Sequence, residues 1–351
     1  MEVFFLDFGF SKKEVKKIIR DFKIKTDVDQ AISSEKFDVF QYSKKPYAVF
    51  ILDCDACMKI ACFPSIIGKE LDDLTLECAK YAFNFLKQKN YFDGSNNKLL
   101  FYHILRASLG YNLHKVAKEK INFSEAWVRT KYVVPSYRDH DDNSKEVNVV
   151  FEDFSSLIGL KNKTVNLLVQ DTVASGKTAF VALKRLFEIS KEQNLNFDKI
   201  IFYGFISEEG MDFLWDSILK HNCNELIVLA LGNLTPLCKN GYDMPLYGPD
   251  ESCYSKSGEL LNLGCIASEQ TIQRWANYFI PGADQPGDWS ERQEIVFTGN
   301  DYQRIDWSKY VNNSLGYLLR LKILLQSNYP WLFGKMRKRI DEEIDALKSK
   351  L

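Results

Sequence analysis

The 351-residue sequence predicts an α/β fold in which a parallel sheet is flanked by helices, with a small α+β addition at the N-terminus and a helical hairpin at the C-terminus. Between about residues 98 and 231, short apolar runs of strand length alternate with longer stretches of helical spacing. One run, at 165–170, passes through a small-residue loop into an amphipathic helix at 179–186. Because the strands of such an alternation are parallel, ligands are expected beyond their carboxyl ends.

The N-terminal addition is predicted to comprise residues 1–69. Ser11 and Glu14 have the spacing of a capping box, which starts a short helix. The strongly apolar run from residue 48 to 67 is strand-like, so this region is expected to mix a helix with strands.

The core is expected at residues 70–300. Its first helix is predicted at 71–89, and the turn-forming stretch 93–97 ends this helix before the first core strand. The stretch 232–270 is rich in glycine, proline, asparagine and serine and is expected to be an insertion without regular structure. Three roles for it stay open: a cap over the ligand cleft, a subunit contact, or a surface elaboration outside the chemistry.

The C-terminal region, residues 301–351, is predicted to form a helical hairpin. Leucine and isoleucine recur with helical spacing after Asp306, and Pro330 breaks this first helix. The highly charged segment 335–348 is expected to form the second helix.

Composition and charge narrow the classes of function. The formal net charge of -1 provides no basic field for a nucleic-acid backbone, so nucleic acid is not an expected partner. Hydrophobic residues make up 46% and charged residues 26%, as in a packed enzyme, and no apolar stretch has the length needed to span a membrane. The chain starts with an acid where a signal peptide has a basic region, which predicts a cytoplasmic protein.

Eight cysteines raise the question of a metal site. Cys54, Cys57 and Cys62 have a C-x2-C-x4-C spacing that could hold zinc or an iron-sulfur centre, and a second group surrounds Cys253. Free cysteine also packs as a small hydrophobic residue, and Cys54 and Cys62 lie in an apolar run. We therefore expect reduced thiols and no metal ligands among them.

The segment 171–178 indicates an anion-binding site. N–H groups at the start of a helix lack intrahelical partners, and small residues let a phosphate approach them closely. Ser175 and Thr178 add hydroxyl donors, Lys177 adds a positive charge, and Asp171 adds an acid at the edge of the loop. The end of the segment matches a Walker P-loop, but Asp171 stands where that motif requires glycine, so a triphosphate loop is not expected.

This strand, acid and loop resemble the ribose-phosphate motif of type I phosphoribosyltransferases, and three further segments follow the order found in uracil phosphoribosyltransferases. The segment 99–110 (LLFYHILRASLG) resembles the pyrophosphate loop of that family. The segment 137–139 (YRD) resembles its hairpin over the active site, and 278–288 (YFIPGADQPGD) resembles its base-binding loop. The resemblance covers about residues 70–231 and 276–300.

The resemblance implies transfer of a 5-phosphoribosyl group from phosphoribosyl diphosphate to a ring nitrogen of a nucleobase or base-like heterocycle, with release of diphosphate. Its implied catalytic residues are Asp171, which meets the ribose hydroxyls, and Arg106 and Arg138, which hold diphosphate. Mg2+ is the implied cofactor, bridging diphosphate and ribose oxygens, and a homodimer is the implied assembly. The implied substrate-binding residues are Ala107, Ser108, Gln170, Thr172, Val173, Ala174, Ser175, Gly176, Lys177, Thr178, Ile280, Gly282, Asp284, Gln285 and Asp288.

Departures from the family pattern affect the expected substrate. Gln170 stands where the family has an acid, and Pro286 removes a backbone N–H from the base-binding loop, which argues against uracil as the acceptor. His103 and Ser108 replace a proline and a glycine of the pyrophosphate loop. These departures keep a second function open: a non-catalytic regulator that senses a nucleotide or phosphoribosyl diphosphate.

Overall fold

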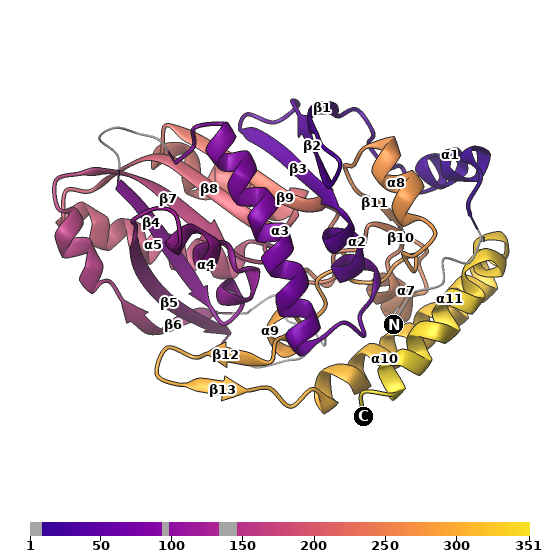
Figure 1. Cartoon of the computed structure of the whole chain (residues 1–351). Coiled ribbons are helices and arrows are strands. Elements are labelled where there is room, and N and C mark those ends of the chain that lie inside the picture. The colour runs from indigo at the N-terminus through magenta and orange to yellow at the C-terminus, as the bar shows by residue number, and fades with distance from the viewer. Residues whose placement is uncertain (1–8, 93–97, 133–145) are drawn as a thin grey trace.

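A nine-stranded mixed sheet with helices on both faces forms the centre of the computed structural model, which describes residues 9–92, 98–132 and 146–351 (Figure 1). The strand order is β1-β2-β3-β9-β8-β7-β4-β5-β6, and neighbours from β3 to β5 in this order pair in parallel. The strands β1, β2 and β6 are antiparallel and lie toward the two edges. The predicted fold class is confirmed. Arg138 and the expected hairpin at 137–139 lie outside the described residues.

The strands of this sheet are β1 (Asp29–Ser33), β2 (Phe37–Tyr42), β3 (Ala48–Cys54), β4 (Lys98–Leu105), β5 (Ser124–Tyr132), β6 (Val147–Asp153), β7 (Thr164–Gln170), β8 (Asn196–Ser207) and β9 (Glu225–Thr235). Two small antiparallel sheets pair β10 (Tyr247–Pro249) with β11 (Asn262–Gly264), and β12 (Ile295–Phe297) with β13 (Tyr302–Arg304). The helices are α1 (Lys12–Asp21), α2 (Asp55–Cys62), α3 (Gly68–Gln88), α4 (Leu113–Lys118), α5 (Lys177–Glu192), α6 (Glu208–Ser217), α7 (Glu251–Ser257), α8 (Glu269–Trp275), α9 (Trp289–Arg292), α10 (Ser308–Asn328) and α11 (Pro330–Lys348).

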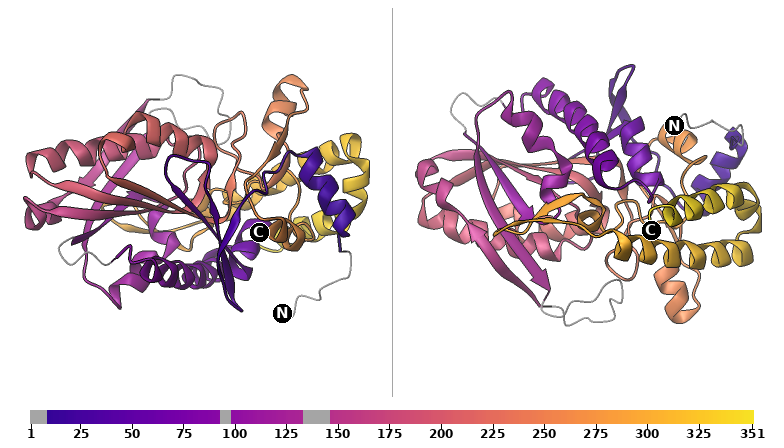
Figure 2. Two further views of the ribbon diagram at one scale, coloured as in Figure 1. Left: turned by 90° about the horizontal axis from the view of Figure 1, so that it is seen from above. Right: turned by 60° about the horizontal axis from the view of Figure 1, so that its bottom comes forward.

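The sheet separates two hydrophobic cores, because successive side chains of a strand point to opposite faces. In β7, Leu168 packs in the core that contains α2, α3 and α4, whereas Leu167 packs in the core of α5 and α6. Figure 2 (left) shows α3 below the sheet and α5 above it. Both faces of β7 are therefore covered, which explains why its sequence is a continuous apolar run.

The N-terminal region extends the central sheet. β3 pairs in parallel with β9, and the expected capping box of Ser11 and Glu14 is present at the start of α1. The prediction of a strand-like run at 48–67 is wrong beyond Cys54, where the chain turns into α2. A continuous apolar run fits a buried helix as well as a buried strand, so its periodicity could not separate the two.

The C-terminal hairpin is confirmed as the pair α10 and α11, which lie side by side in both views of Figure 2. Pro330 begins α11 as its first residue, where proline needs no N–H partner, so this helix starts earlier than the expected residue 335. The stretch 232–270 also differs from expectation, since it holds the end of β9 and the short elements β10, α7 and β11.

One buried arginine joins helix α2 to the segment that follows α8. The guanidinium of Arg292, whose residue is 1% exposed, donates to the carbonyl oxygens of Ile60, Phe63 and Ile66 at 3.0–3.2 Å. It also donates to the carbonyl oxygens of Gln285 and Pro286, at 3.3 and 3.0 Å. The carbonyls at the end of a helix have no intrahelical partners, so Arg292 completes the C-terminus of α2 with a positive charge.

We expect Arg292→Ala to lower the free energy of unfolding by about 3 kcal/mol or more, because the buried carbonyl groups of Ile60, Ile66, Gln285 and Pro286 each lose a donor. Arg304→Ala is the matched control. Its side chain is 76% exposed and pairs with Glu294, so the expected loss is about 0.5 kcal/mol or less. Urea denaturation of both variants measures the two values, and equal losses would contradict the role given to Arg292.

Candidate functional site

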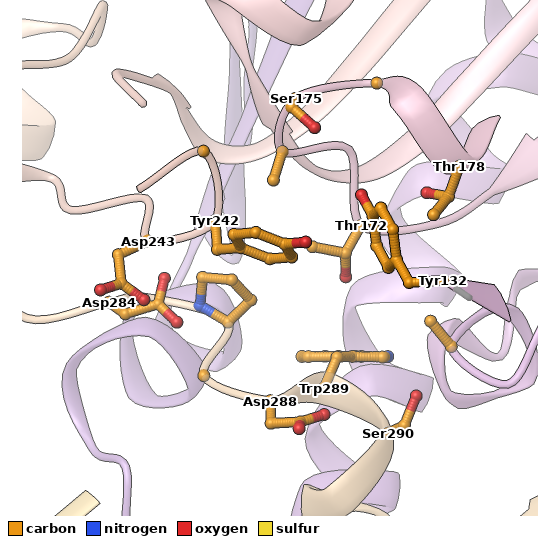
Figure 3. A pocket seen from close by; sticks show the side chains of 16 residues that line it. Tyr132, Thr172, Ser175, Thr178, Tyr242, Asp243, Asp284, Asp288, Trp289 and Ser290 are labelled. Carbon is orange, nitrogen blue, oxygen red and sulfur yellow. The ribbon is translucent and has the colours of Figure 1, made fainter. Parts of the chain in front are cut away.

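A cavity of about 300 Å³ opens beyond the carboxyl ends of β4, β5 and β7. Segments far apart in the sequence meet there: Ala107 follows β4, Tyr132 ends β5, and Thr172 follows β7 (Figure 3). The lining residues are Ala107, Tyr132, Thr172, Ala174, Ser175, Gly176, Thr178, Gly241, Tyr242, Asp243, Asp284, Pro286, Gly287, Asp288, Trp289 and Ser290. The turn after β4 and the loop after β7 thus face a common hollow.

The loop after β7 contributes four of the predicted binding residues between Ala174 and Thr178 to this lining. Gly176 has a φ of +74° and precedes α5, whose first N–H groups therefore lie at the cavity. Helix α6 supports the loop from behind: a Cβ at Gly210 would lie 2.0 Å from the carbonyl oxygen of Ala174, and the Ser207 hydroxyl donates to that oxygen at 2.5 Å. The loop is held in place by a close contact that only glycine permits.

Two residues of this loop that were predicted to bind substrate do not line the cavity. Lys177 is exposed and does not line the cavity, and Val173 is buried in the core beside β8. The charge expected from Lys177 is thus absent from the wall of the cavity in this structure. The part of the lining that comes from this loop is formed by Ala174, Ser175, Gly176 and Thr178 instead.

The turn after β4 contributes Ala107 to the cavity, and its neighbours are held by side-chain contacts. Arg106 donates to the carboxylate of Glu291, a residue of α9, at 2.6 Å. Ser108 is fully buried and lies 3.0 Å from Nδ1 of His103. Arg106 and Ser108 are therefore not lining residues here, although both fix the position of the turn.

Asp171 and Gln170 lie at the end of β7, behind the residues that line the cavity. Burial raises the pKa of Asp171 from 3.8 to about 8, against the opposing effect of a backbone hydrogen bond at Thr172. Gln170 is turned toward α4: its amide nitrogen lies 2.7 Å from Nδ1 of His114, and its amide oxygen accepts from the His114 backbone N–H. Burial also lowers the pKa of His114, to about 3, so this histidine is neutral near pH 7.

The expected base-binding loop is divided between the cavity and the core. Asp284 and Asp288 line the cavity, and the Asp284 carboxylate accepts from the Met244 backbone N–H at 2.8 Å. Gln285 is buried and pairs with the amide of Asn233. Neither Ile280 nor Gly282 lines the cavity. Ile280 is buried in the core, and the Gly282 carbonyl accepts from the Tyr317 hydroxyl.

Aromatic side chains that the sequence motifs do not identify complete the walls. The rings of Tyr132 and Tyr242 lie 6.0 Å apart, and the Trp289 indole stacks on Tyr111 at 4.4 Å. Figure 3 shows both tyrosines between the Ser175 loop and Trp289. Tyr242 comes from the stretch 232–270, so that stretch contributes to the wall of the cavity. Trp289 directly follows the segment 278–288. Its position next to that motif is the one feature of the sequence that could have identified it as a wall residue.

The chemistry of the lining fits a magnesium ion that is held largely by a substrate. Asp243, Asp284 and Asp288 supply carboxylate oxygens, the hard ligands that Mg2+ prefers. Among the described residues, no three carboxylates converge closely enough to form a cage around a metal ion. Mg2+ commonly keeps several waters and binds through one or two carboxylates together with substrate phosphates, which matches this donor set.

Comparisons with known proteins give only distant similarities. No protein-family model and no curated protein matches the chain. Adenine phosphoribosyltransferase from Leishmania tarentolae is 11% identical, with 54% of this chain and 94% of that chain covered, at a TM-score of 0.36. Hypoxanthine phosphoribosyltransferase from Staphylococcus aureus is 16% identical, with 46% and 76% covered, at a TM-score of 0.28. Because both scores lie below 0.5, we base the function on the cavity itself, and closeness to the uracil enzymes stays a prediction.

Within 9–92, 98–132 and 146–351, no helix combines the length and the apolar character that crossing a bilayer requires.

The raised pKa of Asp171 predicts a pH dependence of stability. The folded protein keeps the Asp171 proton between about pH 4 and 8, where the unfolded chain has released it, so this group makes the free energy of unfolding fall as the pH rises through that window. Asp171→Asn cannot titrate. From pH 5 to pH 8, we expect the free energy of unfolding of the wild type to fall by at least about 1 kcal/mol more than that of this variant, as measured by urea denaturation.

Asp216→Asn serves as the control for this comparison, because the Asp216 side chain is 72% exposed on α6. It should keep the wild-type dependence on pH. Parallel pH profiles for wild type and Asp171→Asn would contradict a buried carboxyl group at position 171.

Proposed function

We propose that this chain transfers a 5-phosphoribosyl group from phosphoribosyl diphosphate to a ring nitrogen of a nucleobase or base-like heterocycle. The observation that carries the proposal is the common cavity shared by the turn after β4 and the loop after β7. An activated sugar phosphate has an anionic group at each end, so it requires two anion-binding turns that face one hollow. A cavity of about 300 Å³ is of the size that binds small molecules.

The loop from Ala174 to Thr178 would hold the 5'-phosphate. The N-terminus of α5 directs backbone N–H groups and a partial positive charge toward this position. The hydroxyl groups of Ser175 and Thr178 are additional donors on the lining. Because these donors need no positive side chain, the exposed position of Lys177 is compatible with phosphate binding.

The diphosphate would lie at the turn after β4. Arg106 is the first residue after β4 and precedes Ala107 of the lining, and its guanidinium group suits a phosphate. In this structure the Arg106 guanidinium pairs with the carboxylate of Glu291. On binding diphosphate, Arg106 would exchange this carboxylate for phosphate oxygens. Arg138 remains a proposed second diphosphate ligand from the segment 137–139. Asp171, at the end of β7, is proposed to meet the ribose hydroxyls.

The acceptor would bind between the aromatic and acidic walls. Tyr132, Tyr242 and Trp289 offer ring faces on which a flat heterocycle can stack. Asp243 and Asp284 are hydrogen-bond acceptors beside these rings (Figure 3), which favours a heterocycle that carries N–H or amino donors. This pattern agrees with the argument against uracil from Pro286.

The reaction breaks the bond between the ribose C1 and a diphosphate oxygen and forms a bond from C1 to the ring nitrogen, which loses its proton. A transition state of oxocarbenium character depends on stabilising the leaving diphosphate and on positioning the acceptor, so no protein nucleophile is required. When bound, Mg2+ would neutralise negative charge on the diphosphate. The chain itself would supply the two anion-binding turns, the stacking walls and the exclusion of water.

A second function, a non-catalytic sensor of a nucleotide or phosphoribosyl diphosphate, is favoured by one observation. Gln170 replaces an acid of the ribose motif and is committed to His114, which leaves Asp171 as the single acid at that strand end. Diphosphate release from phosphoribosyl diphosphate and Mg2+, measured across a panel of heterocycles, separates the two functions. Tight binding of phosphoribosyl diphosphate without turnover on any acceptor would favour the sensor.

In the transferase, we expect Arg106→Ala and Asp171→Asn each to lower kcat/KM for phosphoribosyl diphosphate at least about tenfold, a loss of about 1.4 kcal/mol of transition-state stabilisation. The exposed Lys184 of α5 provides the matched control, since Lys184→Ala changes charge on the same helix away from the cavity. Steady-state kinetics with the best acceptor of the panel measures all three variants. Wild-type kinetics for both site variants would reject the site.

Tyr242→Ala is expected to raise KM for the acceptor about fivefold to tenfold, because a stacking face is lost, and to change KM for phosphoribosyl diphosphate much less. Tyr242→Phe keeps the ring and should behave like wild type. Tyr302→Ala is the control for loss of a tyrosine, because Tyr302 lies in β13 and is 70% exposed. An equal rise of both KM values in Tyr242→Ala would argue against a wall dedicated to the acceptor.

A further inference from the structure

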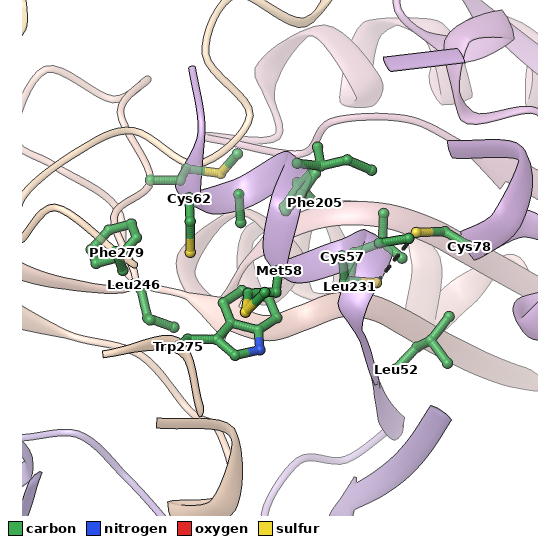
Figure 4. Close-up of a cluster of buried hydrophobic side chains, with 14 of the residues drawn as sticks. Leu52, Cys57, Met58, Cys62, Cys78, Phe205, Leu231, Leu246, Trp275 and Phe279 are labelled. Atoms are coloured by element: carbon green, nitrogen blue, oxygen red, sulfur yellow. Dashed lines mark hydrogen bonds between the residues drawn. The ribbon is translucent and has the colours of Figure 1, made fainter. Parts of the chain in front are cut away.

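Three cysteine sulfurs converge in the core on the α2 and α3 side of the sheet. Cys54 ends β3, Cys57 lies in the first turn of α2, and Cys78 lies in α3. The Sγ atoms are 3.2 Å apart for Cys54 and Cys57, 3.5 Å for Cys57 and Cys78, and 3.9 Å for Cys54 and Cys78. Figure 4 shows Cys57 and Cys78 in contact, whereas Cys62 lies at the other end of α2.

These distances fit the thiolate ligands of one tetrahedral metal ion. Zinc binds thiolate sulfur at about 2.3 Å, which places the sulfurs of a tetrahedral site roughly 3.8 Å from one another. A disulfide requires a sulfur separation of about 2.0 Å and involves two sulfurs, so it does not explain why three converge. An iron-sulfur cluster places iron and sulfide between its cysteines and thereby holds them farther apart than a single ion does.

The surroundings of the sulfurs also fit a bound ion. The hydroxyl of Tyr203, on β8 in the same core, is buried and has no hydrogen-bond partner within the part of the chain that the structure describes. A buried polar group left without a partner in this core indicates that a further group, such as a water, belongs there.

Cys54 is placed to be a thiolate. Its sulfur caps the N-terminus of α2 and accepts from the Cys57 backbone N–H at 3.4 Å, where the helix favours negative charge. A metal ion would take the place of the thiol protons of Cys57 and Cys78.

We propose that Cys54, Cys57 and Cys78 bind one zinc ion as thiolates, with a water in the fourth position. The proposal replaces the expectation of metal-free thiols and exchanges Cys62 of the sequence motif for Cys78. Within 9–92, 98–132 and 146–351, these three are the one group of acid, histidine or cysteine ligands that converges in this way. The ion would tie β3, α2 and α3 together and would enter as the chain folds, since the three residues are at most 1% exposed.

The test begins with the full chain produced in medium supplemented with zinc and purified in buffers that contain a chelator. Elemental mass spectrometry should find about one zinc ion per chain. Production with cobalt in place of zinc should give the intense thiolate-to-cobalt absorption of a tetrahedral sulfur site. Neither measurement depends on transferase activity, so it can fail while the proposed function stands.

Cys57→Ser and Cys78→Ser should each lower the metal content at least about fivefold. Cys62→Ser is the matched control, because Cys62 is a buried cysteine of the same helix outside the group, and it should keep the full content. If the first two variants fail to fold, the cobalt spectrum of the wild type and the number of thiols that react only after denaturation with chelator decide the question. A wild-type chain without zinc or cobalt absorption, or with a disulfide between two of the three cysteines, overturns the proposal.

Discussion

The buried guanidinium of Arg292 is the interaction on which the shape of the cavity depends. Its donors satisfy carbonyl groups at the end of α2 and in the segment Gln285-Pro286, and so join two parts of the chain that are far apart in the sequence. Among the described residues, its hydrogen-bond acceptors are five carbonyl groups, which together set its position. Pro286 and Trp289, on either side of this anchor, are walls of the cavity. The N-terminal region thereby helps to hold the proposed acceptor site, although its own residues do not line it.

Much of the fold could be predicted because local pattern and tertiary structure agree. The run at 165–170, the small-residue loop and the following helix have the same role in the sequence and in the structure, since burial on both faces of a parallel strand requires an apolar run. The run at 48–67 shows the limit of this reasoning. Its change from strand to helix at Cys54 depends on a sulfur cap and on the N–H donors that Arg292, more than two hundred residues away, provides to carbonyl groups at the end of the helix.

The candidate site likewise has a part that the sequence could predict and a part that it could not. The positions of Ala107, Thr172 and Asp284 could be predicted because short motifs encode the turns that follow strands. The directions of the Gln170 and Arg106 side chains could not be predicted. Their partners, His114 and Glu291, come from other elements of the structure. Tyr242 carries no motif at all, and its place in the wall follows from how the stretch 232–270 folds back over the sheet. Side-chain partners across elements are tertiary information, which spacing along one chain does not contain.

The pairing of β3 with β9 has a consequence for how the protein is made. β9, the parallel neighbour of β3, is synthesised only after β8 and α6. Until then, the backbone N–H and C=O groups on that edge of β3 have no strand to pair with, and unpaired strand edges invite aggregation. Shielding of this edge, by a chaperone or by transient local structure, would therefore favour correct folding while the residues between β3 and β9 are being made.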